Sequence, residues 1–304
     1  MPHFVLEVQP NFVAGARLES SKHVVGRLGV RELEPHAVVP AVNAQNIGDA
    51  EKVQAALHGV QEVVGEGAGK LGLLLPDGAV RVTLFSFETL PDDSKQADAL
   101  VRWRMKEHLP YPPEEAKVSY QILWRDSSGI GLLVIAAKNS LITEYAEAIG
   151  IRNGGPDLVL PSTAALLPLV PDSDGEAHLL VHVCSGWVTS AVISARRLEF
   201  WRTKSVAGSA AEVAAGVNAE VTRVLASCRD FLHIEPAKVW LCARGAGEGN
   251  VQTSVLTSSL SSAISKEISA LTFGEKTGEG LSGPEQVLLA SVGAPFAGLM
   301  ANGR

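Results

Sequence analysis

The glycine-rich stretch GAGKLG, from Gly67 to Gly72, spells the G-x-G-x-x-G pattern of loops that bind dinucleotides. Such a loop must follow a strand and open a helix, because the pyrophosphate rests on the helix N-terminus. This stretch instead precedes an apolar strand, so we interpret it as an ordinary loop. It also misses the phosphate-binding loop of nucleoside triphosphatases, since Val64 stands at the first glycine and Leu71 at the residue that would hold magnesium.

Three side chains that could bind a metal ion, His178, His182 and Cys184, alternate on one face of an expected strand. Same-face neighbours lie about 6.5 Å apart along a strand, too far for easy joint ligation of one ion. We therefore favour histidines of the core or of a sheet edge, and expect no metal site. The sequence has no G-x-S-x-G turn for a catalytic serine, and Asp77 and Asp157 occupy turn and loop contexts that account for them.

The elements that must carry these residues begin with a hairpin in HFVLEVQPNFVAGARLES, which turns at residues 9–11. A third strand is expected at HVVGRLGV. Apolar residues at spacings of four, three and four predict a helix over 50–65, with one face formed by Val53, Leu57, Val60 and Val64. The stretch KLGLLLPDGAVRVTLFSF then predicts two strands joined by a Pro-Asp-Gly turn.

The next elements are a helix in KQADALVRWRMKEHL, capped within residues 92–94 and closed by Pro110, and two strands in VSYQILWR and GIGLLVIAAK. A helix in SLITEYAEAIG follows. The stretch GGPDLVLPSTAALLPLVPDSDGE mixes proline, glycine and short helical signals, which indicates a domain boundary. We therefore expect a first lobe over residues 1–175 and a second over residues 176–304.

The second half begins with HLLVHVCSGWVTSAVISARRLEFWRT, residues 178–203, which predicts three strands with a Ser-Gly turn between the first two. A long helix follows from residue 210, then a strand in KVWLCA, a glycine-rich turn in RGAGEG, a serine-rich helix over 253–267 and a terminal helix. Both halves thus open with a strand meander and continue into a helix.

The composition limits the classes of function that the protein can have. Of 304 residues, 46% are hydrophobic and 19% charged, as in a soluble α/β protein. The net charge of -7 disfavours nucleic-acid binding, because phosphate contacts need clustered positive charge. Cys184, Cys228 and Cys242 are widely spaced in apolar surroundings, as is typical of reduced cysteines. No apolar run approaches the roughly 20 residues that span a bilayer, so we expect a cytoplasmic protein that reaches membranes through partners.

The middle of the chain, LGLLLPDGAVRVTLFSFETLPDDSKQADALVRWRMKEHLPYPPEEAKVSYQIL followed by LLVIAAKNSLITEYAEAIG, resembles the PilM family of type IV pilus assembly proteins. That family is actin-like, with FtsA and, more distantly, the cytoplasmic part of GspL as relatives. The likeness is densest over residues 71–170. It implies an actin-like, ribonuclease H-like α/β fold of two lobes, with an inserted subdomain roughly over residues 77–150 and a nucleotide cleft between the lobes.

The same resemblance implies that the nucleotide loops have lost their chemistry. The family's two phosphate loops are Asp-x-Gly turns, in which the carboxylate organises magnesium and the glycine lets the backbone approach a phosphate. Here Glu7 and Gln9 stand at the aspartate and glycine of the first loop, and His182 and Cys184 at those of the second. In the adenine-side turn CARGAG, Arg244 interrupts the glycines.

We therefore expect a protein that is not an enzyme and takes no ATP or magnesium as cofactor. Ser185, Gly186 and Gly245 are the expected remnants of the nucleotide loops, and with Gly247 and Arg244 they could still offer donors for weak nucleotide binding. The alternative is an ATP-binding, actin-like ATPase of the same machine, which intact Asp-x-Gly turns would have favoured.

The partner that the resemblance implies is the N-terminal cytoplasmic tail of a PilN-like inner-membrane protein, bound beside the inserted subdomain. A pilus motor or other platform protein is a further expected partner, and a GspL-like component of type II secretion is a further alternative. From position alone, we expect the tail in a groove formed by Leu100, Arg102, Arg104, Tyr120 and Ile122.

Overall fold

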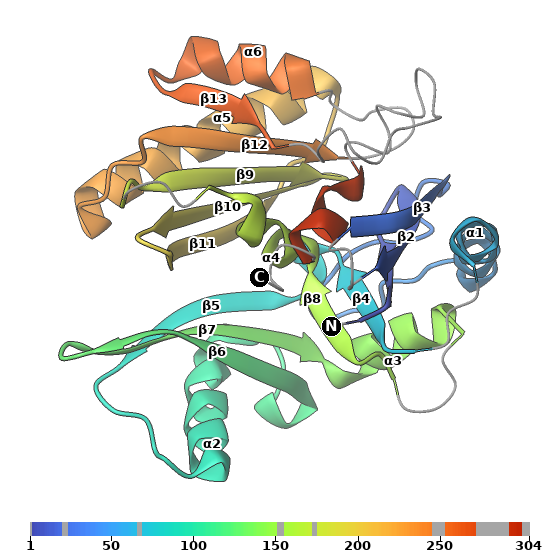
Figure 1. Ribbon diagram of the computed structural model, residues 1–304, viewed down its shortest axis with the longest axis horizontal. Helices are drawn as coiled ribbons and strands as arrows, with labels where there is room; N and C mark the ends of the chain where they lie inside the picture. Colours follow the sequence, from blue (N-terminus) through green and yellow to red (C-terminus); the bar gives the residue numbers. More distant parts are fainter. Residues whose placement is uncertain are drawn as a thin grey trace.

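Two five-stranded sheets of the same topology dominate the structure, a computed structural model that describes residues 2–19, 24–65, 69–150, 155–171, 175–244, 253–271 and 292–299 (Figure 1). The first sheet has the order β3 (Val24–Glu32), β2 (Phe12–Glu19), β1 (Phe4–Val8), β4 (Leu71–Leu75) and β8 (Leu158–Pro161). The second has the order β11 (Arg197–Ser205), β10 (Trp187–Ser194), β9 (His178–Cys184), β12 (Lys238–Arg244) and β13 (Glu267–Ala270).

Each sheet begins as an antiparallel meander and ends with parallel strands. In the first, β1 pairs antiparallel with β2 and parallel with β4. In the second, β9 pairs antiparallel with β10 and parallel with β12. The crossovers to the parallel strands contain α1 (Ala50–Val64) and α5 (Ala210–Ser227), because a parallel connection needs a long excursion over the sheet. The expectation that both halves share one strand meander followed by a helix is confirmed.

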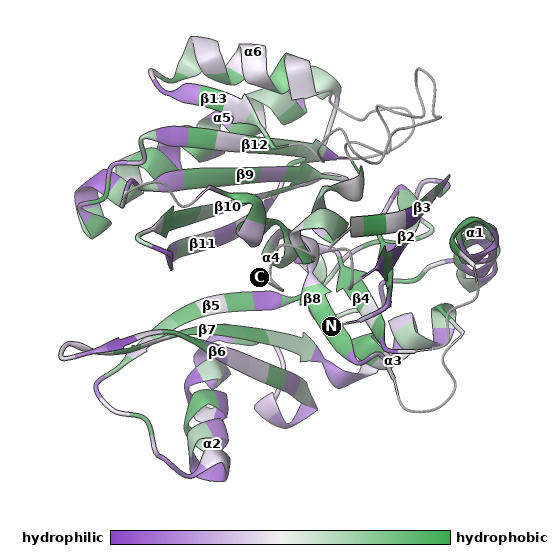
Figure 2. Ribbon diagram, viewed as in Figure 1, coloured by the Kyte–Doolittle hydropathy of each residue, from purple (hydrophilic) through white to green (hydrophobic). Residues whose placement is uncertain are grey.

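Helix α1 shows why these segments fold as predicted. Asp49 caps its N-terminus by accepting a hydrogen bond from the backbone N–H of Lys52. The predicted apolar face is the buried one, and it packs on the first sheet. Figure 2 shows the same segregation elsewhere, with the central strands β9 and β10 mostly hydrophobic and helix α2 (Ser94–Met105) carrying many hydrophilic residues.

A third sheet, of order β5 (Arg81–Phe87), β7 (Gly129–Lys138) and β6 (Ala116–Asp126), lies beside the second (Figure 1). One of its faces packs against α2, whose buried residues are Ala97, Val101 and Met105. The opposite face contributes Leu133 to a cluster that includes Trp201 of β11. This sheet therefore has a hydrophobic contact on each face.

The Pro-Asp-Gly turn after β4 differs from a simple strand connection. Residues 77–79 form a 3₁₀ turn, and the strands on either side belong to different sheets. The two short parallel strands β8 and β13 were not predicted, because four residues at a sheet edge carry too little periodicity to be distinguished from a loop.

The remaining helices complete the two lobes. Helix α3 (Asn139–Ala148) follows β7, the short α4 (Ser162–Leu166) follows β8, and α6 (Thr253–Ala263) precedes β13. Residues 292–299 are helical, and Val292, Phe296 and Leu299 pack against Phe12 and Cys184, which belong to different sheets. No helix in the described segments combines the length and the apolar character needed to span a bilayer.

Candidate functional site between the two lobes

The tips of the two equivalent hairpins contact each other at the top of the site. Ser185 and Gly186 form the tip between β9 and β10 with positive φ angles of 47° and 82°, the left-handed geometry that closes a two-residue hairpin. The hydroxyl of Ser185 donates a hydrogen bond to Oδ1 of Asn11, in the tip between β1 and β2. The two turns that the sequence identified as former phosphate loops are therefore joined to each other.

A buried ion pair joins the lobes below these tips. Arg244, the last residue of β12, donates from Nη1 to Oε1 of Glu7 in β1 over 3.0 Å and from Nη2 to Oε2 of the same carboxylate. Both side chains are fully buried. Burial alone lowers the pKa of Arg244, but the Glu7 carboxylate outweighs it and raises that pKa, so the guanidinium stays charged. A two-point pair of this kind fixes both the distance and the orientation of its partners.

The Glu7 carboxylate has two further donors from its own lobe. Gln9 donates from Nε2 to Oε1 over 2.8 Å, and Ser162 at the start of α4 donates its hydroxyl to the same oxygen over 2.7 Å. Gln9 is only 2% exposed, and its Nε2 also lies 2.7 Å from the hydroxyl oxygen of Ser162. Arg244 in turn donates to the carbonyl of Val292 and lies with its guanidinium carbon 5.6 Å from the ring centre of Phe12.

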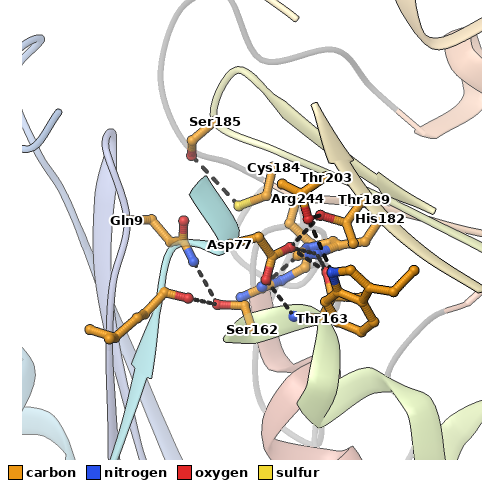
Figure 3. Close-up of polar contacts among 12 residues, drawn as sticks. Gln9, Asp77, Ser162, Thr163, His182, Cys184, Ser185, Thr189, Thr203 and Arg244 are labelled. Carbon is orange, nitrogen blue, oxygen red and sulfur yellow. Dashed lines mark hydrogen bonds and ion pairs between the residues drawn. The ribbon is translucent and has the colours of Figure 1, made fainter. Parts of the chain in front are cut away.

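A second cluster surrounds the carboxylate of Asp77, which the turn after β4 holds inside the protein (Figure 3). Thr163 donates to it from its backbone N–H over 3.1 Å and from its hydroxyl. Thr189 of β10 donates its hydroxyl to Oδ2 over 2.8 Å, and His182 of β9 places Nδ1 3.3 Å from the same oxygen. Asp77 thus connects the first lobe with two strands of the second.

His182 connects the two clusters. Its Nε2 lies 3.4 Å from Nη1 of Arg244, which can only donate, and its Nδ1 lies 2.6 Å from the hydroxyl oxygen of Thr163. We assign the hydrogen to Nδ1 on the basis of these partners. The guanidinium then donates to Nε2, Nδ1–H donates to Thr163, and Thr163 donates to Asp77.

Asp77 stays ionised although it is buried. Burial by itself raises the pKa of Asp77, but the neighbouring His182 and the hydrogen bonds from Thr163 outweigh burial and hold that pKa below its ordinary value. Two carboxylates, one guanidinium and an imidazole are therefore satisfied by one another. The backbone of Gly78 packs closely against the indole of Trp187. A Cβ atom on Gly78 would lie 2.3 Å from that ring, so only glycine fits at this position.

From the sequence we expected no metal site. Among the described residues, no three His, Cys, Asp or Glu side chains are placed to hold one ion. His178 is buried and lies edge-on to the ring of Trp240. Cys184 and Cys242 are buried thiols, and burial raises the pKa of each to about 12, which keeps them protonated and unreactive. Asp157 accepts a hydrogen bond from the backbone N–H of Leu71, a structural role for its loop.

The residues that the sequence singled out as nucleotide-loop remnants have specific places. Ser185 and Gly186 form the hairpin tip that contacts Asn11. Gly245 and Gly247 lie outside the described residues. Arg244, which could have offered a donor to a phosphate, directs its guanidinium at Glu7.

The five residues predicted to form a partner groove lie on α2 and β6 but on two flanks of the helix. Arg104 stacks over the ring of Phe85 in β5, and Leu100 lies one turn before it on the same flank. Arg102, on the opposite flank, donates to the carbonyls of Pro113 and Ala116 at the start of β6.

Tyr120 and Ile122 lie on β6 itself. Burial and the neighbouring Asp98 on α2 raise the pKa of Tyr120, and Ile122 is 43% exposed. Within the described residues, β6 pairs only with β7, so it is an edge strand. The β6 flank therefore combines an exposed apolar side chain with an open strand edge.

Sequence reasoning missed Asp77, Ser162 and Thr163 as members of the central network. The sequence interpretation treated Asp77 as a turn residue, and residues 77–79 do form a turn. The carboxylate does not cap that turn but points into the protein, toward Thr189. The signal that could have found the other two is the pair of hydroxyl residues directly after the apolar strand β8, a place where side chains meet at the end of a parallel sheet.

The sequence matches no protein-family profile and no curated protein. Several solved structures match the fold. A chain of the PilM–PilN type IV pilus biogenesis complex is similar with a TM-score of 0.77 and 15% identity, covering 100% of this chain and 98% of that chain. A protein from Bacteroides thetaiotaomicron with an actin-like ATPase fold and unknown function has a TM-score of 0.56 and 10% identity, over 95% of both chains.

The ethanolamine utilization protein EutJ from Carboxydothermus hydrogenoformans matches with a TM-score of 0.50 and 9% identity, over 99% of this chain and 89% of that one. These similarities confirm the predicted fold class, which the resemblance over residues 71–170 had implied. The chain has the actin-like fold, and over its full length its structure resembles that of a chain from the PilM–PilN type IV pilus biogenesis complex.

Proposed function

We propose that the protein is a non-catalytic cytoplasmic scaffold in the inner-membrane assembly platform of a type IV pilus or a related secretion machine. Its proposed partner is the N-terminal cytoplasmic tail of a PilN-like protein, which places it at the inner membrane through that partner. The observation that carries the proposal is the full-length similarity to a chain of the PilM–PilN complex, with every lobe and the third sheet included in the match.

The non-catalytic part of the proposal rests on the side chains that meet between the lobes. Magnesium and a triphosphate need free carboxylates and backbone N–H groups that a phosphate can approach. Here the Glu7 carboxylate is neutralised by Arg244, and a buried Gln9 side chain, bonded to Glu7 and Ser162, stands at the position of the glycine. The described residues do not fit a magnesium-bound nucleotide, because the cation position beside Glu7 is held by a guanidinium that is part of the protein.

A nucleotide-binding test follows directly. Addition of about 5 mM ATP with excess magnesium is expected to leave the melting temperature unchanged, whereas a ligand at 100 times its Kd would add about 2.7 kcal/mol of stability. Differential scanning fluorimetry measures the shift, and isothermal calorimetry measures binding directly. A magnesium-dependent rise of several degrees would favour the alternative, an actin-like ATPase, and would contradict the non-catalytic assignment while leaving the pilus assignment open.

The partner proposal places the PilN-like tail on the β6 flank of the third sheet. An extended peptide can add to an open strand edge through main-chain hydrogen bonds, while pockets for alternate side chains provide specificity. The exposed Ile122 supplies an apolar contact at this edge, and Tyr120 lies two residues before it on the same face. Arg102 supports the start of the strand through its two carbonyl contacts.

We expect saturable binding when the purified protein is titrated with the cytoplasmic tail peptide of the PilN-like protein encoded beside it, measured by fluorescence anisotropy. Ile122→Asp is expected to weaken the affinity about tenfold or more, because a charge at an apolar contact costs at least about 1.4 kcal/mol. Val255→Asp is the matched control, since Val255 is 50% exposed on α6 in the other lobe.

The possible outcomes separate the site from the function. If the wild-type protein does not bind the tail at high micromolar concentration, the proposed partner is wrong. If the wild type binds and both variants bind equally well, the partner stands but the β6 site is wrong.

A further inference from the structure

Three cationic side chains converge on one buried carboxylate at the edge of the second lobe. Glu220 of α5 is 1% exposed, with Oε1 2.9 Å from Nε of Arg202 and Oε2 3.0 Å from Nη1 of Arg223. Lys204, on β11 with Arg202, places Nζ 3.8 Å from Oε2. The three cations are 41–49% exposed, so each is anchored on the inner side and open on the outer side.

The cluster carries more positive charge than its carboxylate needs. One carboxylate against three cations leaves an excess of two positive charges, on a chain whose net charge is -7. A single Arg or Lys partner could compensate one buried carboxylate. The second and third cations therefore form a local positive site on a protein whose net charge is negative.

The buried carboxylate also preorganises the cations. Exposed Lys and Arg side chains lose rotamer freedom when they bind a ligand, and this loss reduces affinity. Glu220 lies 2.9 Å from Nε of Arg202 and accepts a hydrogen bond from Nη1 of Arg223, so both guanidiniums are held beside the carboxylate while 41% and 49% of their side chains stay exposed. A guanidinium fixed in this way suits the two-point recognition of a carboxylate.

The spacing of the cations indicates the shape of the ligand. Arg202 and Lys204 are two residues apart on one strand, so their side chains leave the same face about 6.5–7 Å apart. Alternate side chains of an extended peptide have the same repeat. We propose that Arg202, Lys204 and Arg223 bind an extended acidic segment of a partner protein, with Asp or Glu at alternate positions. Three cations on an acidic chain are too few for nucleic acid, whose affinity rests on many phosphate contacts.

The probe is a fluorescein-labelled peptide of sequence Glu-Ser-Glu-Ser-Glu-Ser-Glu, titrated with the full-length protein by anisotropy at low and at physiological ionic strength. We expect saturable binding that weakens with salt, as screened charge pairs require. The test variant combines Arg202→Gln, Lys204→Gln, Glu220→Gln and Arg223→Gln, which removes the cations without leaving the carboxylate buried and unpaired. We expect its affinity to fall at least tenfold.

Two further variants keep the test decisive if the fourfold variant does not fold. Lys204→Gln changes only the most loosely held cation, and we expect a twofold to fivefold loss of affinity, about the effect of one exposed ion pair. Lys117→Gln with Arg125→Gln changes the net charge by the same two units as the fourfold variant, on exposed residues of β6, and should leave binding unchanged.

Three results would overturn the proposal. The first is the absence of peptide binding to the wild type at low salt. The second is equal binding by the Lys204 variant and the β6 control. The third is tighter binding of inorganic phosphate or pyrophosphate than of the peptide at the same residues, which would assign a small-anion site instead of a protein-binding surface.

Discussion

Replacing Arg244 with methionine is expected to lower the free energy of unfolding by about 3–5 kcal/mol, the usual cost of removing one partner from a buried ion pair. The methionine leaves the Glu7 carboxylate inside the protein with Gln9 and Ser162 as its remaining donors among the described residues. It also removes the donor that faces Nε2 of His182, which uncouples the ion pair from the Asp77 cluster. Equilibrium unfolding in urea, followed by circular dichroism, measures the loss as a shift of the midpoint.

A double-mutant cycle tests whether the loss belongs to the pair. Adding Glu7→Gln to Arg244→Met removes the unpaired charge, so the double variant should recover much of the stability, since buried ion pairs are often replaced by uncharged residues at little cost. The matched control is Arg197→Met, whose pair with Asp126 is 3.4 Å long and about 40% exposed, and whose loss should cost less than about 1 kcal/mol. Equal losses for Arg244 and Arg197, or additive losses in the cycle, would show that the ion pair does not hold the lobes together.

Much of the fold could be predicted because its signals are local. The apolar face of α1 depends on spacings of three and four within fifteen residues, and every predicted member of that face is buried. The two hairpins depend on turn residues between short apolar strands, and both occur where expected. The meander recurs in each half and was predicted from the strand patterns, whereas the actin-like fold itself was implied by the resemblance over residues 71–170.

The central network could not be predicted in the same way, because its members are far apart in the sequence. Glu7 and Arg244 are separated by 237 residues, and nothing near either one indicates that they meet. Their contact arises because β1 and β12 both end at the interface of the lobes, in sheets that are separate. Sequence reasoning recognised that Glu7, Gln9 and His182 depart from an Asp-x-Gly pattern, but not that they interact with one another.

The duplicated fold explains why a network forms at this place. Strands β1 and β9 are equivalent in their sheets, and they place Glu7 and His182 two residues before the hairpin positions occupied by Gln9 and Cys184. Once they are buried at one interface, a carboxylate and an imidazole each need hydrogen-bonding or oppositely charged partners. Arg244 is the charged partner of Glu7, and Asp77 and Thr163 are the partners of His182. Side chains thus provide the cross-lobe contacts that a ligand could otherwise make.

Asp77→Asn is expected to lower the free energy of unfolding at neutral pH by about 3 kcal/mol, because unsatisfied buried donors cost about 1–3 kcal/mol each. The carboxylate accepts the Thr163 N–H on Oδ1 and the hydroxyls of Thr163 and Thr189 on Oδ2. An asparagine has one acceptor oxygen, and its NH₂ group would face donors in either orientation. In one orientation the Thr163 N–H loses its acceptor, and in the other the two hydroxyls lose theirs, so either orientation weakens the cluster that joins the lobes.

The pH dependence distinguishes a charged Asp77 from a merely well-packed one. The pKa of Asp77 in the folded protein lies below its ordinary value, so the unfolded chain takes up the proton first as the pH falls. The stability that the charge contributes is therefore complete above about pH 4, near the unfolded pKa, and is lost as the pH falls through the folded pKa. The gap between wild type and Asp77→Asn should accordingly be widest at neutral pH and narrow in acid.

Urea unfolding of both proteins between neutral pH and about pH 3 measures this gap, a range that brackets the unfolded pKa of an aspartate. Asp126→Asn is the matched control, because that carboxyl also has a lowered pKa, from its hydrogen bonds with Ser128, but is solvent-exposed, so its replacement should change the stability much less than Asp77→Asn does. A gap for Asp77 that stays constant down to acid pH would mean that its side chain acts by shape alone. If Asp77→Asn lowers the free energy of unfolding no more than Asp126→Asn does, the buried network does not couple the lobes. Asp77, the carboxylate with the most cross-lobe partners, would then contribute no more stability than a surface carboxylate.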